Sequence, residues 1–143
     1  MITLVLDSSV ALKWAFPVAN ETLTHEALRL FQRYRDGEVH FIVPDVFWAE
    51  IANVLRRGAR RGRWTRLDAE TLSEDFAGCN FATVPSLPLL SEAMAIACSH
   101  DRNLFECLYL ALAVQARADW ITADERLADA LAARFPVKWL GAF

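Results

Sequence analysis

Short apolar runs alternate along the chain with longer segments in which apolar residues recur every three or four positions. The short runs have the length and composition of buried strands, and the longer segments have the spacing of amphipathic helices. The pattern predicts strands at residues 2–6, 40–43, 80–84, 120–122 and 137–140. It predicts helices at about residues 22–34, 44–57, 65–76, 88–98, 104–117 and 124–135.

Local signals place several helix boundaries. Pro44 suits the first turn of a helix, and Asp45 suits the positive end of its dipole. Gly58 or Gly62 is expected to end that helix, and Thr65 is a plausible N-cap for the next one. Strands that alternate with helices favour an α/β fold with a mostly parallel central sheet flanked by helices. The length of 143 residues, without a repeat or a long linker, favours one domain over residues 1–143.

Composition adds four expectations. A hydrophobic share of 55% provides a large core and leaves apolar surface for a partner, which suggests a homodimer. A net charge of −3 means that nucleic-acid binding requires a local basic patch or a bound cation. No segment has the apolar length of a membrane span or the pattern of a signal peptide, so we expect a cytoplasmic protein and no membrane partner. Cys79, Cys98 and Cys107 are expected to be reduced core thiols.

Four acidic residues occupy unusual positions. Asp7 ends the first predicted strand, and Asp124 follows the strand at 120–122, so both fall where parallel strands line a crevice. Glu50 and Glu106 are single charges in otherwise apolar helical windows. A buried carboxylate needs a basic partner or a metal, and the chain has only two lysines. Several acids sharing a divalent cation would solve this problem, and oxygen ligands favour Mg²⁺ or Mn²⁺.

Each acid also has a simpler explanation. Asp124 could cap the last helix together with Thr122, and Asp7 could serve a turn. Glu50 and Glu106 could lie on solvated helix faces. The four acids together are more informative than any one of them.

The sequence resembles the PIN-domain ribonucleases, and within them the VapC-type toxins of toxin–antitoxin pairs. The resemblance extends over essentially the whole chain and rests on "VLDSSVALKW" at the start, "AEIANVL" at 49–55, "LFECLYLALA" at 104–113 and "ITADERL" at 121–127. It implies a metal-dependent endoribonuclease that uses Mg²⁺ or Mn²⁺ to hydrolyse RNA phosphodiester bonds, with a VapB-type antitoxin as its partner.

The resemblance also implies roles for individual residues. The catalytic, metal-binding set would be Asp7, Glu50, Glu106 and Asp124, and the supporting polar residues would be Ser8, Ser9, Asn53 and Thr122. The family usually has Asp where this chain has Glu106, and Asp101 is the nearby rival for that position. Carboxylate-held metals suit phosphodiester hydrolysis, which requires an activated water and a neutralised transition state.

A run of arginines follows the helix of Glu50: Arg56, Arg57, Arg60, Arg61 and Arg63. It could bind RNA phosphates, bind an acidic segment of the antitoxin, or form a solvated helix end. The aromatic residues around it, Phe47, Trp48 and Trp64, are expected in the core or in an interface.

Three alternatives belong to other classes. A receiver-like signalling domain would accept a phosphoryl group on Asp45, but its first strand should end in adjacent acids, whereas Ser8 and Ser9 follow Asp7. A haloacid-type phosphatase would need a second Asp where Ser9 stands. A PIN-like protein with a site damaged by Glu106 would only bind RNA or a partner.

Overall fold

The computed structural model describes residues 1–16 and 22–143. Within these ranges the strands form one parallel sheet in the order β3-β2-β1-β4-β5. The strands are β1 (Ile2–Leu6), β2 (Val39–Pro44), β3 (Ala82–Val84), β4 (Asp119–Thr122) and β5 (Val137–Trp139). The α-helices are α1 (Ser8–Ala15), α2 (Thr24–Arg35), α3 (Val46–Arg60), α4 (Arg66–Gly78), α5 (Leu90–His100), α6 (Leu104–Ala116) and α7 (Glu125–Leu131), and the short 3₁₀ helices are η1 (Leu87–Leu89) and η2 (Leu140–Ala142).

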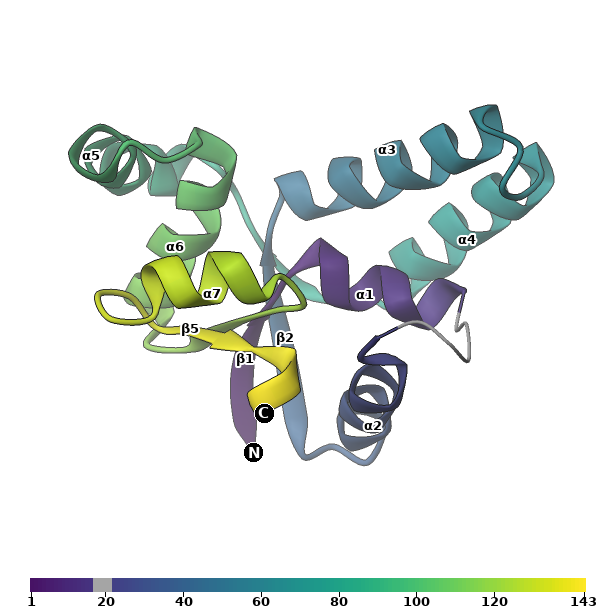
Figure 1. The fold of residues 1–143 in the computed structure, drawn as a ribbon, viewed down its shortest axis with the longest axis horizontal. Coiled ribbons are helices and arrows are strands. Elements are labelled where there is room, and N and C mark those ends of the chain that lie inside the picture. Colours follow the sequence, from purple (N-terminus) through teal and green to yellow (C-terminus); the bar gives the residue numbers. More distant parts are fainter. Residues whose placement is uncertain (17–21) are drawn as a thin grey trace.

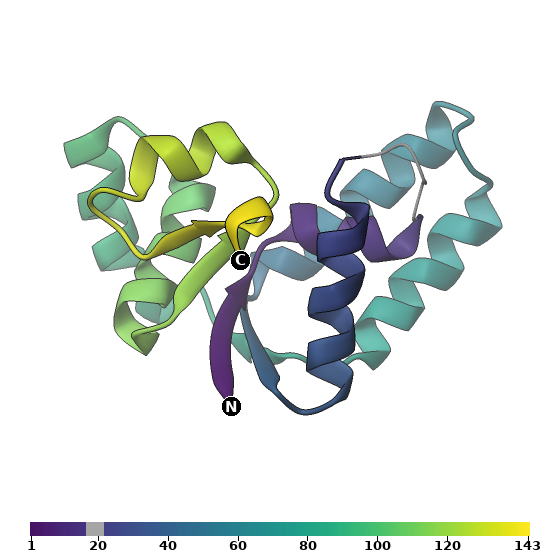
Figure 2. The same cartoon turned by 60° about the horizontal axis from the view of Figure 1, so that its bottom comes forward.

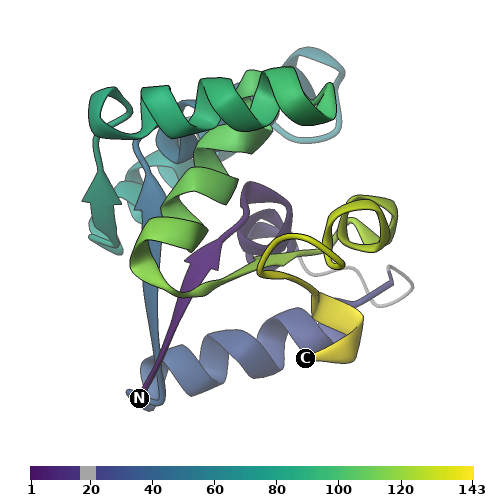
Figure 3. The ribbon, with the colours of Figure 1, turned by 90° about the vertical axis from the view of Figure 1, so that its left-hand side faces the viewer.

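The helices form two groups around the sheet. Helices α1 to α4 lie on one side and α5 to α7 on the other, as two views of the ribbon show (Figures 1 and 2). Strands β1, β2 and β3 point the same way, so their carboxyl ends share one edge (Figure 3). The chain steps from β1 outward to β2 and β3, and later returns to add β4 and β5 on the other side of β1. The carboxyl ends of β1 and β4 therefore flank a topological switch point, where ligands of open α/β sheets bind.

The predicted α/β fold is confirmed, and the sheet is parallel throughout the described residues. Helix α1 was not predicted. It has only eight residues, and Val10 and Ala11 are its buried positions. Its stability comes from the Asp7 cap and from packing, because the Trp14 indole donates a 2.8 Å hydrogen bond to the Ala27 carbonyl of α2. Eight residues carry too little periodicity to distinguish a helix from an extension of β1.

The predicted start of the second long helix was wrong by two residues. Pro44 is the last residue of β2, opposite Val84, and does not open α3. The Asp45 side chain does not cap α3 either, because it accepts a 3.0 Å hydrogen bond from the Ser86 backbone amide. Pairing of β2 with β3 and the bond from Ser86 to Asp45 thus delay the start of α3 to Val46.

The end of α3 has a Schellman arrangement. Gly62 has a φ of +73°, and its amide donates to the Ala59 carbonyl, while the Arg63 amide donates to the Gly58 carbonyl at 2.9 Å. Of the two glycines proposed to end this helix, Gly62 does so and Gly58 lies inside it. Thr65 caps α4 as predicted, in a capping box with Asp68.

The core lies between the sheet and its helices. Its largest fully buried side chains include Trp120, Tyr109, Phe41 and Phe47. All three cysteines are free, but the prediction of core thiols was wrong for Cys98, which is exposed on α5. Among the helices of the described residues, none has the length and apolar character that crossing a bilayer requires.

Candidate functional site

All four acids of the predicted set line one cavity of about 280 Å³. Asp7 follows β1, Glu50 lies on α3, Glu106 lies on α6, and Asp124 follows β4. They come from four elements and meet beside the switch point between β1 and β4. The cavity therefore contains all four acids that the sequence analysis selected, two after strands and two on apolar helices.

Asp7 is fixed by hydrogen bonds from two directions. It is the N-cap of α1, and its Oδ2 accepts from the Ser9 amide and the Ser9 hydroxyl. The hydroxyl of Thr122, which is fully buried in β4, donates to the same oxygen at 3.2 Å. Burial raises the pKa of Asp7 above its ordinary value, and these hydrogen bonds partly oppose that rise.

Ser9, in the first turn of α1, and Thr122 also bind the loop that follows β4. Ser9 Oγ accepts a 3.1 Å hydrogen bond from the Ala123 amide, and Thr122 Oγ1 accepts one of 3.1 Å from the Asp124 amide. The same two hydroxyls therefore orient Asp7 and hold the backbone that carries Asp124. Ser8 also lines the cavity.

Glu50 is oriented by a residue far away in sequence. The Tyr109 hydroxyl, on α6, donates a hydrogen bond of 2.6 Å to Glu50 Oε1. Burial raises the pKa of Glu50, the negative charge of Asp7 raises it further, and the bond from Tyr109 acts in the opposite direction. Burial and the two nearby carboxylates also raise the pKa of Tyr109, so its hydroxyl keeps its proton and remains a donor.

Trp120 contributes a buried donor to the same cavity. Its ring stacks on Tyr109, with centroids 5.1 Å apart and planes 14° apart. The side chain is only 1% exposed, and its Nε1 has no completed hydrogen bond in the described part of the chain. Trp120 lines the acid cavity together with Asp7, and its indole lowers the pKa of that carboxyl. From the sequence, Trp120 was predicted only as part of a strand.

Glu106 has a basic partner that was not predicted. Arg102 Nη2 lies 3.0 Å and Arg102 Nε 3.2 Å from Glu106 Oε2. Helical spacing does not predict this pair, because Arg102 lies before α6, which begins at Leu104. Asp124 has the capping role foreseen for it, since it accepts a 3.1 Å hydrogen bond from the Leu127 amide, and it lines the cavity as well.

Three other candidates lie outside this cavity. Asn53 is exposed on α3 and is not among the lining residues, so the structure does not place it beside the acids. Asp101, the rival of Glu106, is an exposed left-handed residue that ends α5. Asp45, the residue of the receiver-like alternative, is bound to Ser86.

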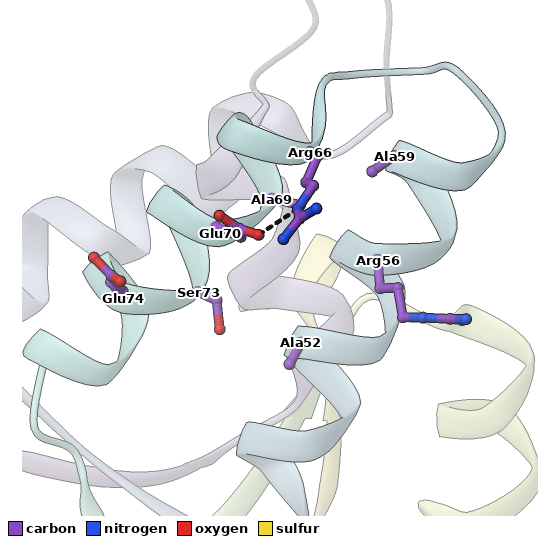
Figure 4. A pocket seen from close by; sticks show the side chains of 8 residues that line it. All are labelled: Ala52, Arg56, Ala59, Arg66, Ala69, Glu70, Ser73 and Glu74. Atoms are coloured by element: carbon purple, nitrogen blue, oxygen red, sulfur yellow. Dashed lines mark hydrogen bonds and ion pairs between the residues drawn. The ribbon is translucent and has the colours of Figure 1, made fainter.

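The arginine run is divided among different surfaces. Arg63 lines a second cavity of about 570 Å³, which shares Ser9 and Asp124 with the acid cavity. Arg56 borders a groove of about 620 Å³ between α3 and α4. In Figure 4, Arg66 pairs with Glu70 one turn further along the same helix, α4, and Arg56 extends away from them. Arg57, Arg60 and Arg61 are exposed and line neither cavity nor this groove.

The flanking aromatic residues are packed against the protein. Phe47 is fully buried, the Trp48 indole donates to the Thr83 hydroxyl at 3.0 Å, and Trp64 is half-buried against α3. The prediction of a core or interface position is confirmed for Phe47. Trp48 and Trp64 are also packed against the protein, through their bonds to Thr83 and Leu55.

The acid cavity suits a divalent cation by its chemistry. It offers carboxylate oxygens from four residues, burial raises the pKa values of Asp7 and Glu50, and the charge of Asp7 raises that of Glu50 further. As the side chains stand, no three acidic, histidine or cysteine residues of the described ranges converge on one ion position. Binding one ion through three of these carboxylates would therefore require a change of side-chain conformation.

Comparisons with known proteins identify the family and the fold. A family model described as the PIN domain matches residues 4–132. Curated protein sequences gave no significant match.

Solved structures show the same fold at low identity. PAE2754 from Pyrobaculum aerophilum has a TM-score of 0.70 and 15% identity, over 99% of this chain and 85% of that one. VapC20 from Mycobacterium tuberculosis, described as a sarcin–ricin loop cleaving toxin, has a TM-score of 0.67 and 15% identity, over 92% and 95%. A toxin–antitoxin complex from Klebsiella pneumoniae has a TM-score of 0.63 and 14% identity, over 96% of each chain. With the family model matching most of its length, the chain belongs to the PIN-domain family.

Proposed function

We propose that this protein is a metal-dependent endoribonuclease that acts as the toxin of a VapBC-type toxin–antitoxin pair. The observation that carries the proposal is that Asp7, Glu50, Glu106 and Asp124 all line one cavity beside the switch point of a PIN-domain sheet. The solved structures named above support the toxin assignment, since two of them are a VapC toxin and a toxin–antitoxin complex.

The four acids are the proposed ligands of Mg²⁺ or Mn²⁺. Such a cation, when bound, would lower the pKa of a coordinated water and neutralise charge on the scissile phosphate. The protein's own contribution is orientation. Ser9 and Thr122 hold Asp7, and Tyr109 holds Glu50. Asp124 is fixed by its cap to α7, and Arg102 pairs with Glu106 at the edge of the cavity.

The proposed partners are RNA, a cognate antitoxin and a second copy of the chain. The α3–α4 groove has a floor of small side chains, Ala52, Ala59 and Ala69, that could receive apolar side chains of an antitoxin (Figure 4). Exposed apolar residues on η1 and α5, Leu87, Leu90 and Met94, are a candidate surface for the homodimer. We place this activity in the cytoplasm, where RNA is available. Analytical ultracentrifugation would test the dimer, and a neighbouring gene for a small DNA-binding protein would support the antitoxin.

The direct test of the activity is RNA cleavage by the purified protein. Cleavage that requires Mg²⁺ or Mn²⁺, stops in EDTA and is lost in both Asp7→Asn and Glu50→Gln would support the proposal. RNA binding without cleavage in either metal would instead favour a PIN-like protein that only binds RNA or a partner. Full activity of Asp7→Asn would contradict the site.

A further inference from the structure

A second cavity adjoins the acid cavity and differs from it in charge. It has a volume of about 570 Å³, which lies within the range of small-ligand pockets. Ser9 and Asp124 line both cavities, so the two are neighbours across these residues. Away from that boundary, the lining includes two cationic residues, Lys13 and Arg63, and two aromatic ones, Phe16 and Trp64.

The backbone separates Arg63 from the rest of the arginine run. The left-handed Gly62 reverses the chain after α3, and the Arg63 amide is bound to the Gly58 carbonyl at 2.9 Å. Arg57, Arg60 and Arg61 precede this reversal. Arg63 therefore faces the second cavity, whereas the neighbouring arginines do not line it.

Trp64 anchors this reversal against α3. Its indole nitrogen donates a 2.7 Å hydrogen bond to the Leu55 carbonyl. Its ring lies so close to Gly58 that a Cβ there would be 1.9 Å from a ring carbon. Phe16 stacks on the same ring at 4.2 Å, and the Arg63 guanidinium lies 5.6 Å from its centroid. The cavity wall is thus built from packed aromatic rings with a guanidinium beside them.

Charge makes this cavity the more favourable contact for a phosphate. Arg63 has no ion pair with a carboxylate among the described residues. Lys13, whose Nζ donates to the Thr22 carbonyl at 2.9 Å, also lines this cavity. The acid cavity, by contrast, repels a polyanion, and the chain as a whole carries a net charge of −3. A nucleic acid therefore needs a cationic contact close to the acids.

We propose that this second cavity is a subsite for single-stranded RNA, next to the acids. Arg63 binds the phosphate adjacent to the scissile one, and the Phe16–Trp64 wall contacts the sugar or base of that nucleotide. A guanidinium fork fits phosphate oxygens, and aromatic walls beside cations are typical of single-strand binding. The position of this phosphate next to a scissile one rests on the proposed function, whereas RNA binding by Arg63 can be tested without it. A phosphodiester chain suits the two adjoining cavities better than an acidic peptide, because its successive phosphates can lie at the cation of one and at Arg63 of the other.

Binding without catalysis is the first test. A short fluorescein-labelled single-stranded RNA is titrated with the wild type and variants in EDTA, by fluorescence anisotropy over a range of KCl concentrations. Arg63→Ala should weaken binding about tenfold and reduce the slope of log affinity against log salt by about 0.7. Arg63→Lys should keep the salt slope while binding more weakly than wild type. Arg61→Ala is the matched control, since it removes the same charge two positions away, and it should change affinity by less than about twofold.

Cleavage in Mn²⁺ separates the subsite from the proposed activity. If the wild type cleaves, Arg63→Ala should raise KM much more than it lowers kcat. If it cleaves and the Arg63 and Arg61 variants behave alike, the subsite is wrong and the nuclease stands. If it binds RNA without cleaving, with binding still specific to Arg63, the nuclease is wrong and the subsite stands. No RNA binding by the wild type, or an Arg63→Ala effect only on antitoxin affinity, would overturn the subsite.

Discussion

The Tyr109 hydroxyl donates a 2.6 Å hydrogen bond to Glu50 Oε1. Tyr109 also stacks on Trp120, and this aromatic pair lines the same cavity as Asp7 and Glu50. Since both rings are almost fully buried, this pair holds the acids from the core side of the cavity. Residues of this kind set the orientation of metal ligands without being ligands themselves.

Tyr109→Phe removes the donor and keeps the ring. Glu50 should then be less well oriented, and affinity for Mn²⁺ should fall about 10- to 100-fold in isothermal titration calorimetry. The free energy of unfolding should fall by about 1–2 kcal/mol, because a buried hydrogen bond is lost. Tyr34→Phe is the control, since the Tyr34 hydroxyl binds the Cys79 carbonyl and lies outside the acid cavity. Equal Mn²⁺ affinity in the Tyr109 variant and the wild type would show that this hydrogen bond does not orient a ligand.

The Trp120 indole should respond to metal. If Asp7 turns toward a bound cation, the hydrogen-bonding environment of the Trp120 N–H changes, and its ¹⁵N–¹H resonance should move on addition of Mg²⁺. Trp139 provides an internal comparison, because its indole nitrogen is also buried without a partner among the described residues and it does not line the acid cavity. The indole resonance that is missing from the spectrum of Trp120→Phe belongs to Trp120. A shift of the Trp139 signal without one of Trp120 would contradict this role.

Asp7→Asn should stabilise the metal-free protein at neutral pH. Burial raises the folded-state pKa of Asp7 above its ordinary value of 3.8, so its ionisation costs stability. The stability contributed by the protonated acid is present below about pH 3.8 and is lost as the pH rises through the raised pKa. In EDTA, the free energy of unfolding of Asp7→Asn relative to the wild type should therefore increase by about 0.5–2 kcal/mol as the pH rises from 4 to 7. Urea unfolding at several pH values measures this difference. A constant difference across that range would mean that Asp7 titrates normally.

Glu106 tests the position where this chain differs from the usual family residue. Glu106→Gln should lose most metal-dependent cleavage, because it removes the charge that Arg102 now holds ready at the cavity. Glu106→Asp should retain cleavage or improve it, since a shorter carboxylate has less torsional freedom to fix. Asp101→Asn is the control and should be nearly silent, because Asp101 lies outside the cavity. Normal cleavage by Glu106→Gln together with an inactive Asp101→Asn would reverse the assignment.

The sequence allowed the fold and the acid set to be predicted because both leave local signals. Apolar runs and helical spacing identified the strands and most helices, and single charges in apolar windows identified Glu50 and Glu106. Contacts between distant segments left no such signal. Tyr109 and Glu50 are 59 positions apart, and only the packing of α6 against the sheet brings them together. The pair of Arg102 and Glu106 left no helical signal either, because Arg102 lies before the start of α6.

The sequence also did not show that the arginines of the run face different surfaces on the two sides of a turn. In the sequence the five members of the run are equivalent, but the Gly62 reversal gives Arg63 a different surface from Arg57, Arg60 and Arg61. A glycine after a helix predicts an end to that helix, but the direction of the following residue depends on where Trp64 packs. Helix α1 was missed for a related reason, because its cap and its packing partners stabilise it more than its own eight residues do.

The most direct measurement is the anomalous difference density of crystals soaked in Mn²⁺. We expect a peak in the cavity formed by Asp7, Glu50, Glu106 and Asp124, with a carboxylate oxygen of Asp7 at about 2.0–2.2 Å, near the distance typical of small divalent cations. The peak should be absent from Asp7→Asn crystals soaked in the same way. Strong density elsewhere on the protein with none in this cavity, or an undiminished peak in Asp7→Asn, would contradict the assignment of these acids as a metal-dependent nuclease centre.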